Sequence, residues 1–181
     1  MELKETRISS ALVYDGDFLK VHKDQARMPD GSVSQREYIT HPGAVAVLAI
    51  LDNGNLLFER QYRYAPEQEF IEIPAGKIDH GEDILLTARR ELLEETGYVA
   101  SEWTHLNTTW PCIGYANERM EYFLARGLCH EGHQLDEGEF LEVFELPFAE
   151  AMQWMKTGRI NDSKTMLGLF LLEKHLSGWS A

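Results

Sequence analysis

Short blocks of β-prone residues, separated by turn signals, dominate the first forty residues of the chain. The two turn signals are Asp15-Gly16 and Pro29-Asp30-Gly31, and such dipeptides between β-prone segments are typical of hairpins. The pattern predicts an antiparallel strand meander over residues 1–40. Because so small a sheet buries little apolar surface alone, we expect it to pack on the main domain or on a second subunit.

The next segment, "AVAVLAILDNGNLLFERQYRY", predicts two strands. The first is apolar almost throughout, which favours a strand that is buried on both faces. The turn signal Asp52-Asn53-Gly54-Asn55 predicts that the two strands form a hairpin. A further strand, "EFIEIPAG", is expected to end at Pro74 and Gly76, since proline cannot donate to a strand ladder.

Helical periodicity then replaces the strand pattern. Apolar residues Leu85, Ala88 and Leu92 form one stripe, which predicts a helix over residues 82–96 with Gly97 after its C-terminus. More strands follow, then a helix from near Pro147 to Gly158 and a last helix capped by Asp162 or Ser163. This order predicts an α/β (α+β) sandwich with a mixed sheet, made of a meander over 1–40 and a main domain over 41–181.

Composition and charge restrict the kinds of molecule that the chain can bind. The chain has 181 residues and a formal net charge of -13, and a field of that sign repels nucleic acid and anionic membranes. A phosphate-ester substrate would therefore need a divalent metal or a local cluster of Arg and Lys. The two cysteines do not have the spacing of a metal or redox motif. The N-terminal residues lack a basic-then-apolar order, and no apolar run is long enough to span a membrane. These features, with the charge, predict a cytoplasmic protein with no membrane or nucleic-acid partner.

Three glutamates on the predicted central helix are the candidate chemistry. Glu91, Glu94 and Glu95 are spaced by three and four residues, so they share one helix face, and Arg90 reaches Glu94 at i+4. Like charges that close repel unless a cation lies among them, and carboxylates suit a hard dication. The preceding loop "GKIDHG" can bend tightly and turn the Ala75 carbonyl towards the same place. A solvated acidic face is the other interpretation of this pattern.

The spacing around these glutamates resembles the Nudix box. Gly76, Glu82 and the run Arg90-Glu91-Leu92-Leu93-Glu94-Glu95-Thr96-Gly97 stand at its fixed positions. Only Tyr98 departs from it, where a branched aliphatic residue is usual. The resemblance implies a Nudix-type α/β/α sandwich and hydrolysis of a nucleoside diphosphate linked to a second group, assisted by Mg²⁺ or Mn²⁺. It implies metal binding by Glu91, Glu95 and Glu94, and a supporting role for Glu82.

The flanks "ERQYRYAPEQEFIEIPAGKID" and "TWPCIGYANERMEYFLA" resemble the ADP-ribose and ADP-sugar pyrophosphatases. This resemblance implies conversion of ADP-ribose to AMP and ribose 5-phosphate by a homodimer, whose meander contributes to the partner's adenosine pocket. Two alternatives stay open. One is a GDP-mannose-type sugar nucleotide pyrophosphatase, and the other is a non-catalytic Nudix module that binds a nucleotide.

By the same resemblance Arg63 contacts the substrate phosphates, and a bidentate arginine suits that role. The alternative is that Arg63 pairs with Glu69 or Glu72 on a neighbouring strand, with Glu72 facing the substrate or serving only as that partner. The catalytic base is expected in "DEGEF" rather than in the box. We assign Glu137 as the base, acting with Glu91 and Glu95, and Glu139 as a further metal ligand, and these two roles can be exchanged.

Overall fold

The structure is a computed structural model that describes residues 2–132, 138 and 140–178. The fold class predicted from the sequence is confirmed: helices and strands form a mixed α+β architecture. The elements divide between two compact units. The first unit comprises residues 1–43 and 110–119, and the second comprises residues 44–109 and 120–181.

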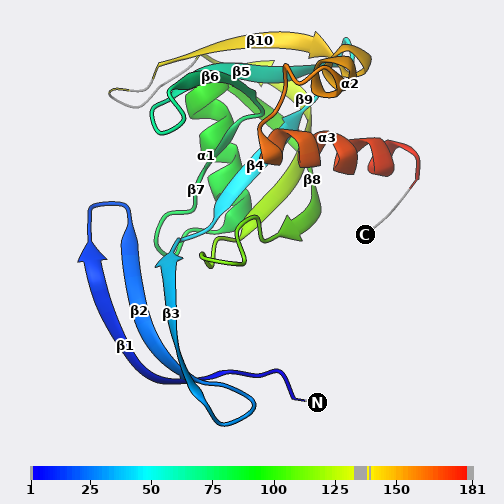
Figure 1. The fold of residues 1–181 in the computed structure, drawn as a ribbon. Helices are drawn as coiled ribbons and strands as arrows, with labels where there is room; N and C mark the ends of the chain where they lie inside the picture. The colour runs from blue at the N-terminus through cyan, green and yellow to red at the C-terminus, as the bar shows by residue number, and fades with distance from the viewer. Residues whose placement is uncertain (1, 133–137, 139, 179–181) are drawn as a thin grey trace. The chain divides into compact units, whose positions relative to one another are not determined.

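The first unit is the predicted meander with one addition. Its antiparallel strands, drawn in blue in Figure 1, are β1 (Thr6–Asp15), β2 (Lys20–Arg27) and β3 (Val33–Thr40). The segment 110–119 joins this unit because the backbone of Ile39 bonds to it on both sides. The Ile39 N–H donates to the Tyr115 carbonyl at 2.8 Å, and the Ile39 carbonyl accepts from the Asn117 N–H at 3.3 Å.

The second unit is built on a mixed four-stranded sheet in the order β7-β4-β9-β8. Its strands are β4 (Ala44–Ala49), β7 (Ala75–Lys77), β8 (Tyr98–Thr109) and β9 (Met120–His130). Strand β4 pairs in parallel with β9 and antiparallel with β7. Every residue of β4 is buried, as its apolar composition predicts. Its alternate side chains supply two separate apolar clusters, one on each face of the sheet.

The hairpin predicted between the first two strands of this unit forms only at its turn. Strand β5 (Asn55–Arg63) lies in a different sheet, of order β10-β5-β6, with β6 (Gln68–Glu72) and β10 (Leu141–Pro147). The turn itself is formed, by an antiparallel bridge between Ile50 and Leu56 and by a hydrogen bond of 2.9 Å from the Leu51 N–H to the Asn55 carbonyl, but the pairing does not continue along β4 and β5. The physical reason is that β9 pairs with β4 over its whole length and β7 pairs with Ala44–Ala46 on the other edge, while β5 pairs with β6 and β10 instead.

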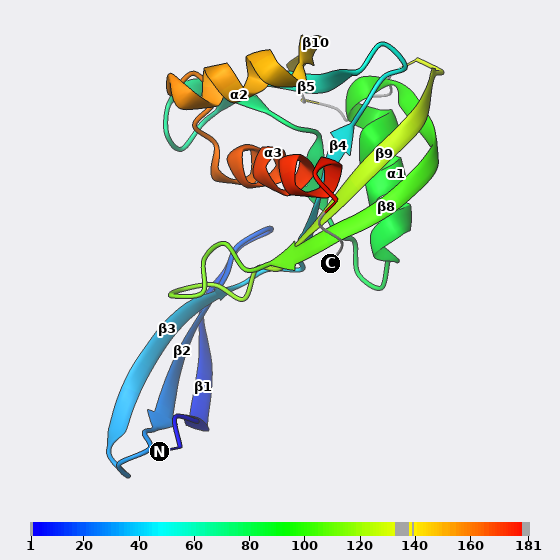
Figure 2. The same ribbon diagram turned by 90° about the vertical axis from the view of Figure 1, so that its right-hand side faces the viewer.

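Three helices cover the second unit, and they are α1 (Ile84–Thr96), α2 (Phe148–Lys156) and α3 (Ser163–Leu176). Helix α1 lies on one face of the four-stranded sheet, and α3 lies on the opposite face (Figures 1 and 2). Helix α1 begins later than the pattern predicts, because the Asp83 side chain accepts from the N–H groups of Leu85 and Leu86. It ends as predicted: Gly97 has φ 76°, and its N–H donates to the Leu93 carbonyl.

Helix α3 begins at the predicted position, with Asp162 as its N-cap. Within the described residues, no helix is both long and apolar enough to cross a membrane.

Candidate active site

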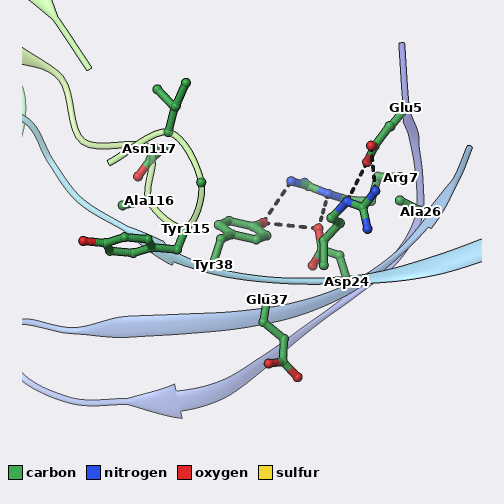
Figure 3. Close-up of a pocket in the computed structure, with 12 residues that line it drawn as sticks. Glu5, Arg7, Asp24, Ala26, Glu37, Tyr38, Tyr115, Ala116 and Asn117 are labelled. Atoms are coloured by element: carbon green, nitrogen blue, oxygen red, sulfur yellow. Dashed lines mark hydrogen bonds and ion pairs between the residues drawn. The ribbon is translucent and has the colours of Figure 1, made fainter. Parts of the chain in front are cut away.

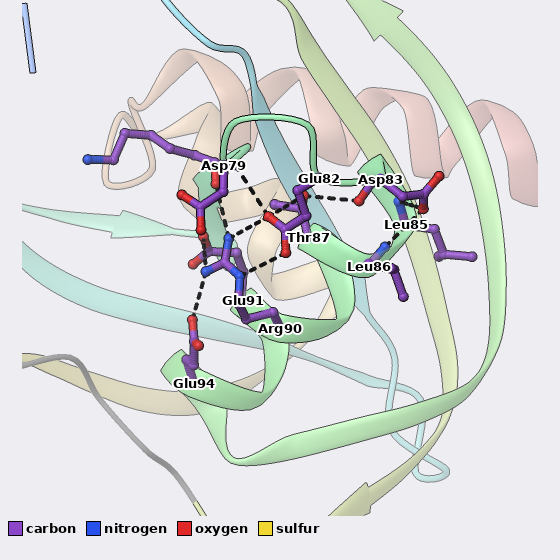
Figure 4. Close-up of polar contacts among 10 residues, drawn as sticks. Asp79, Glu82, Asp83, Leu85, Leu86, Thr87, Arg90, Glu91 and Glu94 are labelled. Carbon is purple, nitrogen blue, oxygen red and sulfur yellow. Dashed lines mark hydrogen bonds and ion pairs between the residues drawn. The ribbon is translucent and has the colours of Figure 1, made fainter.

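Arg90 is the centre of a charged cluster on helix α1. Its Nη1 group donates to Glu91 Oε1 and to Glu94 Oε2, at 2.9 Å each. Its Nε and Nη2 groups donate to the two oxygens of Glu82, at 3.1 and 3.0 Å. Figure 4 shows the guanidinium among these three carboxylates. Arg90 therefore orients all three glutamates. The sequence predicts only one of these contacts, the i+4 pair with Glu94.

The loop before α1 is fastened to the helix by the same arginine. The Arg90 Nη2 group also donates to the Lys77 carbonyl at 3.2 Å, and Glu82 accepts from the Asp79 N–H and from the Thr87 hydroxyl. Hydrogen bonds from Arg90, followed by those from Thr87 and the Asp79 backbone, lower the pKa of Glu82 to about 2. Glu82 is thus a supporting carboxylate that stays ionised and joins the loop to the helix.

Gly76 allows a close approach between its strand and α1. A Cβ atom at this position would lie 1.9 Å from Glu91 Cδ, which is far inside van der Waals contact. Any larger residue here would have to displace the Glu91 carboxylate, which occupies the space of a side chain. The sequence predicted that Gly76 serves the bend of the loop, whereas the structure shows that it makes room for Glu91.

Glu95 is held against Ala75, the residue before Gly76 in the same strand. Its Oε2 atom accepts from the Ala75 N–H at 2.9 Å, and only 4% of Glu95 is exposed. The predicted metal ligands Ala75, Glu91 and Glu95 are thus brought together, because β7 lies beside α1. Glu94 contacts Arg90 instead, with its Oε2 atom 2.9 Å from Arg90 Nη1.

The donor set of this face fits a hard divalent cation, because Glu91 and Glu95, which lie against residues 76 and 75, both offer carboxylate oxygens. Among the described residues, no three acidic, His or Cys side chains already stand in a metal-binding arrangement. The Glu91 and Glu94 oxygens instead face Arg90. Glu137 and Glu139, expected as base and as metal ligand, lie outside the described residues.

Arg63 forms a bidentate pair with Glu72. Its Nε and Nη2 groups donate to the two Glu72 oxygens at 2.7 and 2.8 Å. The pairing that the sequence offered as an alternative is therefore present, and it is made with Glu72, since Glu69 pairs with Arg60. Glu72 is 4% exposed at its side chain and Arg63 is 44% exposed. The guanidinium remains accessible although its carboxylate partner is buried.

Chain connectivity brings this pair near the acidic face. Glu72 ends β6, and Ala75 begins β7 only three residues later. A fully extended chain advances by at most ~3.6 Å per residue, so the two Cα atoms lie within about 11 Å of each other. An exposed guanidinium and a set of carboxylates near one another are suited to a phosphate-metal complex.

Sequence reasoning missed the group behind Glu72, which is Lys164 on α3. Its Nζ atom pairs with Glu72 and, at 3.0 Å, with Asp162 Oδ2. One signal was present in the sequence. Lys164 is the second residue of a helix, where the helix dipole disfavours a cation. A lysine at that position is therefore a sign that a carboxylate from elsewhere in the chain lies beside it.

The first unit holds a polar pocket of its own, with a cavity volume of about 340 Å³. Arg7 pairs with Asp24 at 2.7 Å and donates to the Tyr38 hydroxyl at 3.0 Å. Figure 3 shows these three side chains together, with Glu5 close by. Residues 113–117, from the added segment, complete the lining of the pocket.

Two family models together match residues 5–167. Residues 40–167 match the NUDIX domain, and residues 5–39 match the nucleoside diphosphate sugar hydrolase N-terminal domain. The chain belongs to the Nudix family. It is a Nudix hydrolase in which an N-terminal domain precedes the Nudix domain, so the resemblance of the box is confirmed.

Curated relatives cover nearly the whole chain. It is 40% identical over 172 residues to a methanol dehydrogenase activator of Bacillus methanolicus, covering 94% of this chain and 93% of the relative. It is 37% identical over 173 residues to an ADP-ribose pyrophosphatase of Bacillus subtilis, covering 94% of both. A GDP-mannose pyrophosphatase of Escherichia coli is 32% identical over 160 residues, with 81% of this chain and 83% of the relative covered.

A crystal structure of an ADP compounds hydrolase is similar to this structure with a TM-score of 0.89 and 26% identity. The match covers 98% of this chain and 97% of that one. The Nudix-type fold that the box implied is confirmed by this likeness.

Proposed function

We propose that this Nudix hydrolase cleaves the pyrophosphate bond of a nucleoside diphosphate sugar, converting ADP-ribose to AMP and ribose 5-phosphate. The observation that carries the proposal is the position of Glu91 and Glu95, whose carboxylates lie against the backbone of Gly76 and Ala75. The likeness to an ADP-ribose pyrophosphatase and to an ADP compounds hydrolase supports the choice of substrate.

The cation in this proposal is Mg²⁺ or Mn²⁺. Glu91, Glu94 and Glu95 would hold it, together with the Ala75 carbonyl and Glu139. When bound, such a cation neutralises charge on diphosphate oxygens and makes a water more acidic. The chain prepares this site by pairing Glu91 and Glu94 with Arg90 and by keeping residue 76 free of a side chain.

The remaining chemistry falls to two groups. Arg63 binds the diphosphate and neutralises part of its charge. Glu137 accepts one proton from the attacking water, whose oxygen forms the new bond to phosphorus while the bridging phosphorus–oxygen bond breaks.

Glu137→Gln separates these roles. If Glu137 is the base, we expect kcat to fall by about two to four orders of magnitude while metal affinity stays within about twofold. Glu139→Gln is the matched variant, and it is expected to weaken metal binding. The reverse result, with Glu139→Gln lowering kcat alone, would exchange the two assignments.

A substrate panel with Mg²⁺ tests the reaction itself. ADP-ribose, GDP-mannose and other nucleotide sugars are incubated with the enzyme, and the products are resolved by chromatography. We expect ADP-ribose to give the highest kcat/KM, with AMP and ribose 5-phosphate as products. GDP-mannose is the serious competitor, given the relative that bears its name. Faster turnover of GDP-mannose would replace ADP-ribose as the substrate, and nucleotide binding without any turnover would indicate a binding module.

The proposal includes a homodimer formed through the first unit. All residues of β1 are exposed in the single chain, and Ile8, Leu12, Val13 and Tyr14 are among the large apolar side chains left in solvent. A second copy of the chain would cover these side chains, and its meander would contribute to the adenosine pocket. Sedimentation is expected to show a dimer for the native chain and a monomer for Leu12→Glu. Leu176→Glu, which changes an exposed leucine of α3, is the control.

A cytoplasmic location, without nucleic-acid partners, belongs to the same proposal. Neither Cys112 nor Cys129 forms a disulfide, and the net charge of -13 disfavours binding to polyanions.

A further inference from the structure

Four charged side chains form a continuous chain of contacts from helix α3 to strand β5. Asp162 and Glu72 both contact the Nζ atom of Lys164, and the two oxygens of Glu72 accept from Arg63. Lys164 is 14% exposed at its side chain and Glu72 is 4% exposed. Only the arginine end of this chain of contacts is substantially accessible.

A lysine at this position has a clear energetic cost. It lies in the first turn of α3, where the helix dipole disfavours a cation. Burial, with the charge of Arg63 nearby, lowers the pKa of Lys164 to about 7, and the negative charge of Glu59 acts in the opposite direction. Apolar residues in place of both Lys164 and Glu72 would avoid these costs, because a whole buried ion pair is often no more stabilising than well-packed apolar residues. Stability therefore gives no sufficient reason for the Lys164–Glu72 pair.

The contact geometry supplies another reason. A carboxylate that accepts only from an exposed arginine can rotate with it. Here Lys164 holds Glu72 from the buried side, and Lys164 is itself held by Asp162, which caps α3 and accepts from the Thr165 N–H at 2.9 Å. The Thr165 hydroxyl accepts from the Ile73 N–H at 3.0 Å, so the helix is also joined to the residue after Glu72. Glu72 is therefore fixed from two directions, and its bidentate pair fixes the plane of the Arg63 guanidinium.

We propose that Lys164 is a positioning residue for diphosphate binding, which holds Glu72 so that the Arg63 guanidinium is preorganised for the substrate phosphates. The inference rests on the proposed function, because it takes Arg63 to contact phosphate. Preorganisation lowers the cost of ordering a flexible side chain on binding. Losing Lys164 therefore weakens binding of a diphosphate without removing any group that contacts it.

The test is a double-mutant cycle between Lys164→Met and Arg63→Ala, which isolates the coupling that these two residues exert through Glu72. The affinity for inorganic pyrophosphate with Mg²⁺ is measured by calorimetry, and KM and kcat are measured with ADP-ribose. We expect Lys164→Met to raise both the pyrophosphate Kd and KM about fivefold, with kcat changed by less than about twofold. In the Arg63→Ala background the same substitution is expected to change neither value.

Two further variants separate positioning from folding. Lys164→Arg keeps the cation and is expected to keep the pyrophosphate Kd within about twofold of the native value. Lys174→Met removes a lysine of the same helix that pairs with Glu173 at the surface, and it is expected to have no effect on binding. If Lys164→Met does not fold, Lys164→Gln replaces it in the cycle. An equal loss of affinity with and without Arg63, or no loss in a folded variant, would overturn the proposal.

The two readouts keep this inference distinct from the proposed function. Pyrophosphate binding coupled between Lys164 and Arg63, in an enzyme that turns over no nucleotide sugar, would leave the inference standing and reject the function. Turnover of ADP-ribose without that coupling would support the proposed function and reject the inference about Lys164. An enzyme that neither binds pyrophosphate nor turns over any nucleotide sugar would reject both.

Discussion

The carboxylate of Glu91 occupies the space where residue 76 would carry a side chain. The distance from Glu91 Cδ to an ideal Cβ on Gly76 is 1.9 Å, so any other residue at 76 must displace Glu91. Glu91 is a flexible side chain, and it can move without unfolding the protein.

Gly76→Ala is therefore expected to damage the metal site more than the fold. We expect divalent-cation affinity to fall at least about tenfold by calorimetry, while the free energy of unfolding changes by about 1 kcal/mol or less. Gly168→Ala is the control, because a Cβ there meets Ile73 Cδ1 at 2.8 Å in the core of the second unit. That variant is expected to change stability and to leave cation affinity intact. A Gly76→Ala enzyme with native metal affinity would contradict the assignment of Glu91.

Glu95→Gln tests the second carboxylate of the site. Glutamine keeps an oxygen that can accept from the Ala75 N–H, so the variant is expected to fold. It removes one negative charge from the donor set, and turnover of every nucleotide sugar is expected to fall by at least about a hundredfold, together with metal affinity. Unchanged activity across the substrate panel would show that Glu95 does not bind the metal.

Glu82→Gln should alter the dependence of stability on pH. The folded-state pKa of Glu82 is about 2, which is below the usual glutamate value of 4.5, so this group stabilises the fold fully above pH 4.5. That contribution is lost as the pH falls from about 4.5 to about 2. Urea unfolding at pH 7 is expected to show a loss of about 1–2 kcal/mol, after allowance for partial exposure of the pair.

The comparison between native and variant protein is needed because other carboxylates titrate over the same range. The difference in free energy of unfolding between the native protein and Glu82→Gln is expected to shrink as the pH falls below 4.5. Glu131→Gln, at an exposed carboxylate, is expected to show no such difference. A difference that stays constant down to pH 2 would exclude the Arg90 pair as its cause.

Asp162→Ala should weaken the start of helix α3. Asp162 Oδ2 accepts from the Thr165 N–H at 2.9 Å and from the Thr165 hydroxyl at 2.7 Å. Loss of such a cap costs about 0.5–2 kcal/mol, and thermal unfolding should show it as a lower Tm. Asp162→Asn keeps a good N-cap but removes the charge beside Lys164. It is expected to recover most of the stability, and an equally low Tm for both variants would show that the ion pair matters more than the cap.

Local signals in the sequence account for much of this protein. The ends of α1 and α3 follow from Gly97 and Asp162, because capping depends on residues only a few positions apart. The grouping of Glu91, Glu94 and Arg90 follows from helical spacing for the same reason. The Nudix box combines these local signals at fixed intervals, so the amino-acid sequence alone was enough to predict the family.

Contacts between distant parts of the chain were decided by the tertiary structure alone. The β4–β5 hairpin predicted from a good turn signal forms only at its turn, because β7 and β9 pair with β4 while β6 and β10 pair with β5. The carboxylate of Glu91 meets Gly76 only because α1 packs on β7. Lys164 meets Glu72 across 92 positions of sequence. Such pairings depend on which sheet edges and helix faces remain available after packing, and neither residue type nor local spacing carries that information.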